Sequence, residues 1–187
     1  MNLEQAKQIV KDILPEKRYI HTLGVIESAL SLAKEHGVSE EDAGIAAALH
    51  DMAKFHDKQE MRAVIVDREL DPALLQFHHE LWHAPVGAVF AKEKLNITNE
   101  EILNAIRYHT TGRPGMSDLE KVIYLADYIE PGRSFNGVEN VRAVAHEDLD
   151  EAMKIALKQS IQFLISKNQP VFPDTLASYN EYVQKEK

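Results

Sequence analysis

Apolar residues recur along this chain at intervals of three and four, whereas the alternation that is typical of a half-buried β-strand is never sustained. Intervals of three and four place apolar side chains on one face of a helix, so the sequence predicts an all-α fold. The 187 residues are enough for one sizeable core, and no repeat or linker divides them. We therefore expect a single domain over residues 1–187, a helical bundle.

Residues that cap helices indicate where each helix begins. Asn2 is followed by Gln5, and Ser117 by Glu120, which is the spacing of a capping box, and we expect Thr98 to cap a further helix. The expected helices cover about residues 2–14, 19–36, 39–51, 83–95, 98–109, 117–130, 148–167 and 174–185, with two short helices between residues 55 and 81.

The apolar stripes also predict which face of each helix is buried. In the first helix the stripe includes Val10 and Ile13, and in the second it includes Leu23 and Ile26. The alanine-rich stretch before His50 favours close packing between helices. We expect the helices of residues 148–185 to pack on a core formed by about residues 17–133.

Composition limits the classes of function. The 30 acidic residues outnumber the 21 basic residues, so we expect no long-range attraction to nucleic acid or to an anionic membrane. The longest apolar run, near residues 45–49, is far shorter than the roughly 20 residues of a membrane span, and residues 1–15 do not resemble a secretory signal. The sequence contains no cysteine, which fits a reducing cytoplasm and leaves histidine and carboxylate as metal ligands.

Several histidines and aspartates follow buried helical segments. His50 and Asp51 come together at the end of the alanine-rich helix, and burying such a pair costs free energy unless a cation compensates. His21 and Asp127 project from two other helices that are mainly buried. These four donors from three helices suit iron, manganese, cobalt or zinc. For His50 and Asp51 alone, an ion pair with Lys54 at the helix end is an equally good interpretation.

Four local motifs occur in the order that is typical of one family. They are KRYIHTLGV at residues 17–25, LHDMAK at 49–54, YHTTG at 108–112 and YLADYIEPGR at 124–133. With these motifs the chain resembles the HD-domain family of metal-dependent phosphohydrolases, and more specifically its YqeK group. The resemblance implies an all-helical fold and symmetrical hydrolysis of diadenosine tetraphosphate to two ADP.

The resemblance also implies a metal centre with an open position for water, whose pKa falls on binding to the metal. Iron is the favoured metal, with manganese, cobalt or zinc as alternatives. His83 and His109 either hold a second metal, with Asp51 bridging, or contact substrate phosphate; we favour one metal, with these histidines facing the phosphates. The implied ligands of the first metal are His21, His50, Asp51 and Asp127.

Other residues are candidates for catalysis or substrate contacts. Lys54 lies on the same helical face as Asp51, and Arg18 and Arg133 are candidates for forked contacts with phosphate; a local ion pair and surface solubility are the alternatives. The turn before the last helix offers an aromatic ring for a base and amides for an anion, although docking of the C-terminal helix is the favoured interpretation there. The candidates for catalysis are Asp51, Lys54, His83 and His109, and those for substrate contact are Arg18, Lys54, His83, His109, Thr110, Arg133, Phe172 and Thr175.

Three rival interpretations stay open. The substrate is another nucleotide, or the metal organises a nucleotide-sensing module without turnover, or the chain is a purely structural bundle. The third would leave six buried ionisable groups without a partner. We expect a cytoplasmic protein whose partner is a small dinucleoside polyphosphate or nucleotide, with no nucleic acid and no membrane, and the sequence is compatible with a homodimer.

Overall fold

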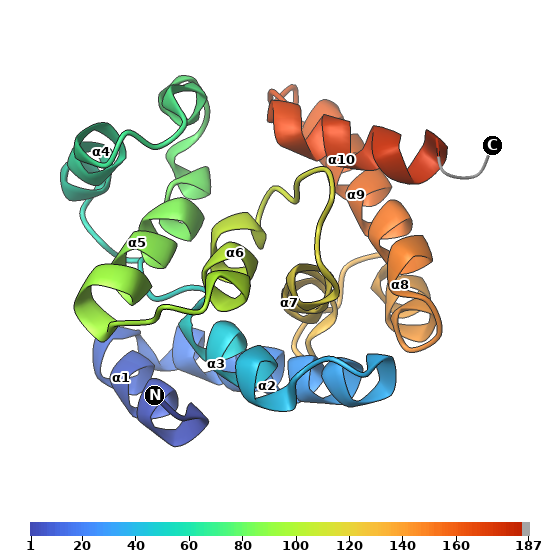
Figure 1. Ribbon diagram of the computed structural model, residues 1–187. Coiled ribbons are helices and arrows are strands. Elements are labelled where there is room, and N and C mark those ends of the chain that lie inside the picture. Colours follow the sequence, from blue (N-terminus) through green and yellow to red (C-terminus); the bar gives the residue numbers. More distant parts are fainter. Residues whose placement is uncertain (185–187) are drawn as a thin grey trace.

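The structure, a computed structural model, describes residues 1–184, which form ten α-helices, two 3-10 helices and no β-strand (Figure 1). The all-α prediction is therefore confirmed. The α-helices are α1 (Leu3–Ile13), α2 (Glu16–His36), α3 (Glu40–Leu49), α4 (Lys58–Asp67), α5 (His83–Leu95), α6 (Glu100–Tyr108), α7 (Asp118–Ile129), α8 (Val138–Ala145), α9 (Leu149–Ser166) and α10 (Pro173–Gln184), and the 3-10 helices are η1 (Pro72–Gln76) and η2 (His79–Leu81).

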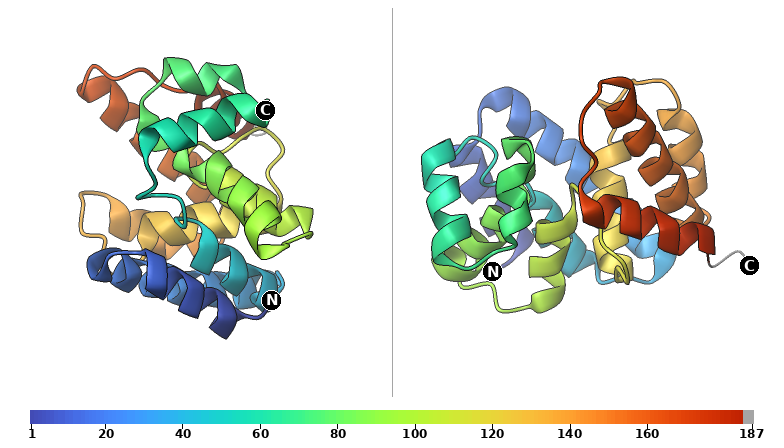
Figure 2. Two further views of the ribbon diagram at one scale, coloured as in Figure 1. Left: turned by 90° about the vertical axis from the view of Figure 1, so that its left-hand side faces the viewer. Right: turned by 90° about the horizontal axis from the view of Figure 1, so that it is seen from above.

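Helix α7 lies at the centre of the bundle. It packs against α2, α3, α6, α8 and α9, while α5 packs on α6 and α10 packs on α9. Two views agree that α4 and α5 (green) lie on one side of α6 and α7, and that α9 and α10 (orange to red) lie on the other (Figures 1 and 2). A side chain on the inner face of α7 can therefore meet residues from several helices.

The predicted capping boxes are present. The side chain of Asn2 accepts a hydrogen bond from the amide of Gln5 at 2.9 Å, and the side chain of Gln5 accepts one from the amide of Asn2 at 2.9 Å. Ser117 and Glu120 make the same reciprocal pair at the start of α7. Helix α5 begins at His83, as expected. Local hydrogen bonding therefore fixes where these helices begin.

Several predicted helix positions are wrong. The cap of α6 is Asn99 rather than Thr98, because the Asn99 side chain accepts from the amide of Glu101 at 3.0 Å. Between residues 55 and 81 only α4 is an α-helix, and the remainder forms η1 and η2. Helix α8 was missed, since it is short and begins at Val138, directly after Gly137, which has a φ of 91° and provides no capping side chain. The expected helix end at Lys185 lies outside the described residues.

The buried face of α2 also differs from the prediction. Leu23 is 37% exposed, and in α1 Ile13 is 46% exposed. Ile26 is buried as predicted, and the buried stripe of α2 also contains Thr22, Val25 and Ala29. Small residues in this stripe allow α3 and α7 to approach α2, whereas Leu23 lies on the neighbouring, more exposed face.

Helix α3 delivers two polar residues into the core. Every residue from position 43 to position 49 is buried, and the helix ends with His50 as its C-cap. His50 and Asp51 are both completely buried. The high burial of this helix therefore decides that an imidazole and a carboxylate lie in the interior.

None of the helices between residues 1 and 184 combines the length and apolar character that a membrane crossing needs.

Candidate metal centre

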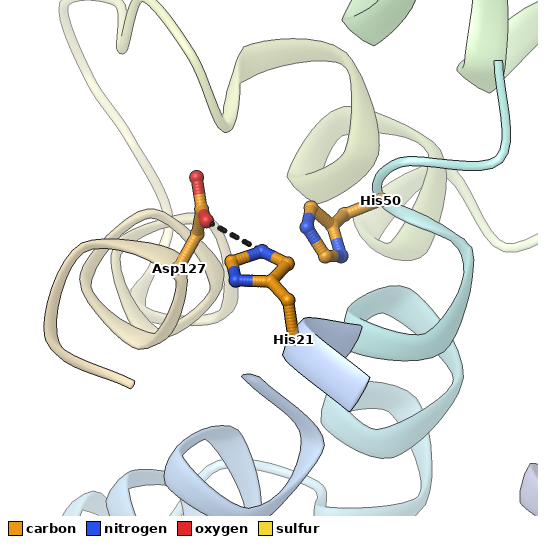
Figure 3. A group of neighbouring side chains, drawn as sticks. All are labelled: His21, His50 and Asp127. Atoms are coloured by element: carbon orange, nitrogen blue, oxygen red, sulfur yellow. Dashed lines mark ion pairs between the residues drawn. The ribbon is translucent and has the colours of Figure 1, made fainter. Parts of the chain in front are cut away.

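One buried cluster contains all six histidines and aspartates that the sequence singled out as the centre of the site. They come from α2, from the turn after α3, from the start of α5, from the turn after α6 and from α7. Figure 3 shows three of them, His21, His50 and Asp127, facing one another. The six residues are His21, His50, Asp51, His83, His109 and Asp127.

Asp51 is the centre of this cluster. Its Oδ2 atom lies 3.0 Å from Nε2 of His50 and 3.8 Å from Nε2 of His21. Its Oδ1 atom lies 3.1 Å from Nε2 of His83 and 3.8 Å from Nε2 of His109. The two carboxylate oxygens therefore face two different pairs of histidines.

Backbone carbonyl groups set the tautomer of three of these histidines. In each of them Nδ1 lies within hydrogen-bond distance of the carbonyl oxygen three residues earlier, in the preceding turn of the chain. A carbonyl oxygen can only accept, so Nδ1 carries the proton and Nε2 presents a lone pair to Asp51. The contacts are His50 to Ala47 at 2.6 Å, His83 to Glu80 at 2.6 Å and His109 to Ile106 at 2.7 Å.

Burial keeps these imidazoles neutral. It lowers the pKa of His83 and of His109 to about 3, and it holds the pKa of His50 well below its usual value. At neutral pH the three rings therefore carry no charge. A neutral imidazole with a free lone pair is the form that binds metals.

His21 is oriented by a side chain instead of a carbonyl group. Its Nδ1 atom lies 3.1 Å from Oε1 of Glu130, and its Nε2 atom lies 3.1 Å from Oδ1 of Asp127 (Figure 3). Burial by itself would raise the pKa of Asp127, but the contact with His21, the facing imidazole of His50 and the guanidinium of Arg133 outweigh it and hold that pKa well below the usual value. Asp127 is therefore an ionised carboxylate, and it lies beside Nε2 of His21, an atom of the kind that binds metals.

These atoms fit a metal because almost all of them are acceptors. The Nε2 atoms of His83 and His109 lie 3.1 Å apart although both Nδ1 atoms already carry the protons. In the cluster, three buried acceptors have no hydrogen-bond partner among the described residues: Nε2 of His21, Nε2 of His50 and Oδ1 of Asp51. Buried acceptors without donors cost free energy unless a cation satisfies them. Imidazole and carboxylate donors without sulfur suit a divalent metal such as iron, manganese, cobalt or zinc.

The three predicted cationic residues lie around the cluster. The guanidinium of Arg18 donates to Oδ2 of Asp51. Arg133 donates to Oδ1 of Asp127 at 2.7 Å and to the backbone carbonyl of that residue at 2.9 Å. Each of the two carboxylates that are candidate metal ligands, Asp51 and Asp127, is therefore in contact with an arginine.

Lys54 and Thr110 lie on the side of His83 and His109. The ammonium group of Lys54 is 2.7 Å from Oε2 of Glu80, the residue whose carbonyl orients His83. The Oγ1 atom of Thr110 is buried and has no hydrogen-bond partner among the described residues. Lys54 is therefore held beside the residue that orients His83, and Thr110 leaves a buried hydroxyl group next to His109 in the sequence.

Phe172 and Thr175 lie farther along the same side. Phe172 is 5% exposed and packs edge to face against Phe77, with ring centroids 5.1 Å apart. The amide of Thr175 donates to the carbonyl of Phe172 at 3.1 Å, so this amide is not free for an anion. These contacts agree with docking of the C-terminal helix. The two residues also line a pocket of about 560 Å³, together with Thr110.

Glu130 is a residue that the sequence analysis missed. It is 5% exposed, accepts from the amide of Gly132 at 2.6 Å through Oε2, and holds His21 through Oε1. A Cβ atom at Gly24 would lie 2.7 Å from Oε2, so any other residue there would force the carboxylate of Glu130 to move. The available signal was an acidic residue directly before Pro131, inside the fourth motif.

Helix α8 holds the turn that carries Glu130. The guanidinium of Arg142 donates to the carbonyl of Ile129 at 2.9 Å and to that of Glu130 at 3.1 Å, and it also reaches the carbonyl of Arg133 at 3.2 Å. These carbonyls at the C-terminal end of α7 lack partners inside the helix. The missed helix therefore helps to orient His21, through Glu130.

Comparisons with known proteins show which family and which proteins this chain is similar to. The HD domain family model matches residues 18–132. The symmetrical bis(5'-nucleosyl)-tetraphosphatase of Bacillus subtilis (strain 168) is 52% identical over 180 residues, covering 96% of this chain and 97% of that protein. The protein of the same name from Halalkalibacterium halodurans is 51% identical over 187 residues, covering 100% of both chains. The crystal structure of a predicted HD superfamily hydrolase involved in NAD metabolism, from Clostridium acetobutylicum, superposes with a TM-score of 0.92 at 38% identity, covering 97% of both chains.

Replacing Glu130 should weaken metal binding. A carboxylate accepts from both His21 and Gly132, whereas the amide of Glu130→Gln offers only one acceptor oxygen. Because groups that orient a metal ligand typically change metal affinity 10- to 100-fold, we expect about a tenfold loss for Glu130→Gln and about a hundredfold loss for Glu130→Ala. Competition with a chelator measures the affinity. The exposed Glu147→Gln is the control for the change of charge, and unchanged affinity in both Glu130 variants would contradict the prediction.

The metal-free protein should lose stability in mild acid. In the unfolded chain His83 and His109 bind protons near pH 6.5, but in the folded chain their pKa is about 3. Between these two pKa values the unfolded state therefore binds more protons than the folded state. The free energy of unfolding is highest above pH 6.5, and it falls as the pH drops toward 3. We expect each histidine to contribute a loss on the order of 1 kcal/mol per pH unit in this window. Urea unfolding at pH 7, 6 and 5 should show a shallower dependence for His83→Asn, and an equal slope would count against this account.

Proposed function

The chain belongs to the HD domain family, and on this premise we propose that it is a metal-dependent hydrolase that cleaves diadenosine tetraphosphate symmetrically into two ADP. The observation that carries the proposal is the cluster of buried acceptor atoms around Asp51, which fits a divalent metal. The substrate is supported by relatives of this name that are 52% and 51% identical along nearly the whole chain.

We propose iron as the metal and His21, His50, Asp51 and Asp127 as its ligands, with manganese, cobalt or zinc as alternatives of similar ligand preference. When bound, such a metal lowers the pKa of a water molecule and offsets negative charge on phosphate oxygens. The protein contributes the fixed tautomers, because Nδ1 of His50 is occupied by a carbonyl group and Nδ1 of His21 by Glu130.

The orientation of His83 and His109 favours a role as ligands of a second metal. Both donate through Nδ1 to carbonyl groups, so their Nε2 atoms present lone pairs and have no proton to donate to a phosphate oxygen. They also face Oδ1 of Asp51, whereas His50 faces Oδ2. Two metals that share one bridging carboxylate are a common arrangement in phosphohydrolases. We therefore propose this arrangement over the single metal that the sequence favoured.

The cationic side chains would bind the polyphosphate. Arg18 and Arg133 each contact a carboxylate of the cluster, and a phosphate group that arrives there offers them a second, forked partner. Lys54 lies near His83 and His109, where its charge contributes to lowering the pKa of both rings. These three cations would fix the phosphate chain and offset the charge that develops on the departing ADP.

In the reaction, water adds to a phosphorus next to the central bridging oxygen, and the bond between that phosphorus and the bridging oxygen breaks. The oxygen of water remains in one ADP and the bridging oxygen leaves with the other. Attack and departure in line require the chain to be held on both sides of the reacting phosphorus. We further propose that the protein works in the cytoplasm without nucleic acid or membrane, in keeping with its net charge of −9. A homodimer is compatible with this proposal.

Product analysis tests the substrate. The purified protein loaded with iron or manganese should convert diadenosine tetraphosphate to ADP alone, without AMP or ATP, which chromatography of the reaction mixture resolves. Adenosine triphosphate and a cyclic dinucleotide serve as competing substrates. Release of AMP and ATP would overturn symmetrical cleavage. Turnover of the competing substrates with intact diadenosine tetraphosphate would overturn the substrate, and tight binding without any product would favour a sensor.

Asp51→Asn tests the metal centre. The amide keeps the shape of the side chain but removes the negative charge that both pairs of histidines face, so we expect the bound metal to be lost and hydrolysis to fall at least 10³-fold. Elemental analysis of the purified protein and rate measurements check the two outcomes. Circular dichroism establishes that the variant is folded. A folded variant with wild-type turnover would remove Asp51 from the mechanism.

A further inference from the structure

Two pockets lie near different residues of the cluster around Asp51. One of about 860 Å³ is lined by His21, which faces Oδ2 of Asp51. The other, of about 560 Å³, is lined by Thr110, next to His109, which faces Oδ1. Their linings have no residue in common. A molecule that spans the cluster can therefore enter a different pocket at each end.

The larger pocket, called the Phe55 pocket here, changes in character with distance from the cluster. Its inner end contains Arg18 and Arg133, whose guanidinium groups already contact Asp51 and Asp127. Its outer part is apolar: it includes three of the exposed large hydrophobic residues of the chain and one further cation, Lys17. The three are Ile20, Leu23 and Phe55, which are 60%, 37% and 59% exposed.

Cationic side chains at the inner end and apolar side chains in the outer part match the phosphates and the base of one half of a dinucleoside polyphosphate. The phosphates would meet the arginines beside the cluster, and a nucleobase would meet the apolar end. The ring of Phe55 is exposed and pairs with no other aromatic ring among residues 1–184. Exposed aromatic rings beside cationic side chains stack bases in nucleotide-binding proteins.

We propose that the Phe55 pocket binds one nucleoside diphosphate half of the substrate, with its base on Phe55 and Ile20. This inference rests on the proposed function, because only a substrate with a nucleoside at each end needs a nucleoside position on both sides of the reacting phosphorus. The pocket beside Thr110 then receives the other half. The apolar surface of Ile20, Leu23 and Phe55 is thereby assigned to substrate rather than to a second copy of the chain.

Two variants of the metal-loaded enzyme test the Phe55 pocket. Phe55→Ala removes the stacking surface, so KM for diadenosine tetraphosphate should rise about tenfold, while kcat changes less than about twofold. Ile20→Ala should raise KM severalfold. The metal content of both variants should equal that of the wild type, because neither residue belongs to the cluster of histidines and aspartates.

The chain supplies a matched control for each variant. Phe163 is 60% exposed and Ile165 is 62% exposed, both on α9, and neither lines the Phe55 pocket. Phe163→Ala and Ile165→Ala should leave KM and kcat unchanged. Sedimentation velocity of all four variants and of the wild type establishes whether the oligomeric state is the same.

Three outcomes would overturn the inference. An unchanged KM in Phe55→Ala would show that the base does not lie there. A change of oligomeric state in Phe55→Ala and Ile20→Ala, but not in the controls, would assign the apolar surface to an interface between copies. A wild-type enzyme that does not hydrolyse diadenosine tetraphosphate would overturn the proposed function itself, and with it the need for a second nucleoside position. The first two results leave the proposed function intact.

Discussion

The constraint on which this structure depends is the burial of acceptor atoms that face one another without donors. Nε2 of His83 and Nε2 of His109 lie 3.1 Å apart beside Oδ1 of Asp51, and His50 approaches the other oxygen of that carboxylate at 3.0 Å. No rearrangement of protons among these groups supplies enough donors, because the Nδ1 atoms are already committed. A bound divalent cation would offset this repulsion, so we expect metal binding to stabilise this interior.

Helix ends provide the rigidity that such a centre requires. The last carbonyls of a helix have no partner inside it, and His50 and His109 each take up one of these carbonyls where α3 and α6 end. The same need for partners at the end of α7 is met by Arg142, which fixes the turn that carries Glu130. Groups that satisfy the backbone therefore also fix the directions of the metal ligands.

A protein with a net charge of −9 must bind a polyanion through local charge. Cationic side chains are concentrated at the cluster: Arg18 and Arg133 contact its two carboxylates, and Lys54 lies near His83 and His109. Salt screens the repulsion between distant acidic residues and a polyanion. The contacts of the cationic side chains act at hydrogen-bond distance, where salt screens them much less. The pocket lined by His21 and the pocket lined by Thr110 have no lining residue in common, as the proposed binding of one nucleoside at each end of the substrate requires.

The sequence by itself determined the helical class, the capping boxes at Asn2 and Ser117, and the six residues of the cluster, because periodicity, capping and motif order are local properties. It did not reveal α8, the exposed side of Leu23, or Glu130. Those features depend on which helices meet: α2 buries the face that lets α3 and α7 approach, and Glu130 reaches His21 across more than one hundred residues of sequence. Only the tertiary structure decided that the Nε2 lone pairs converge on one carboxylate, since tautomers are fixed by distances between atoms and not by the order of residues.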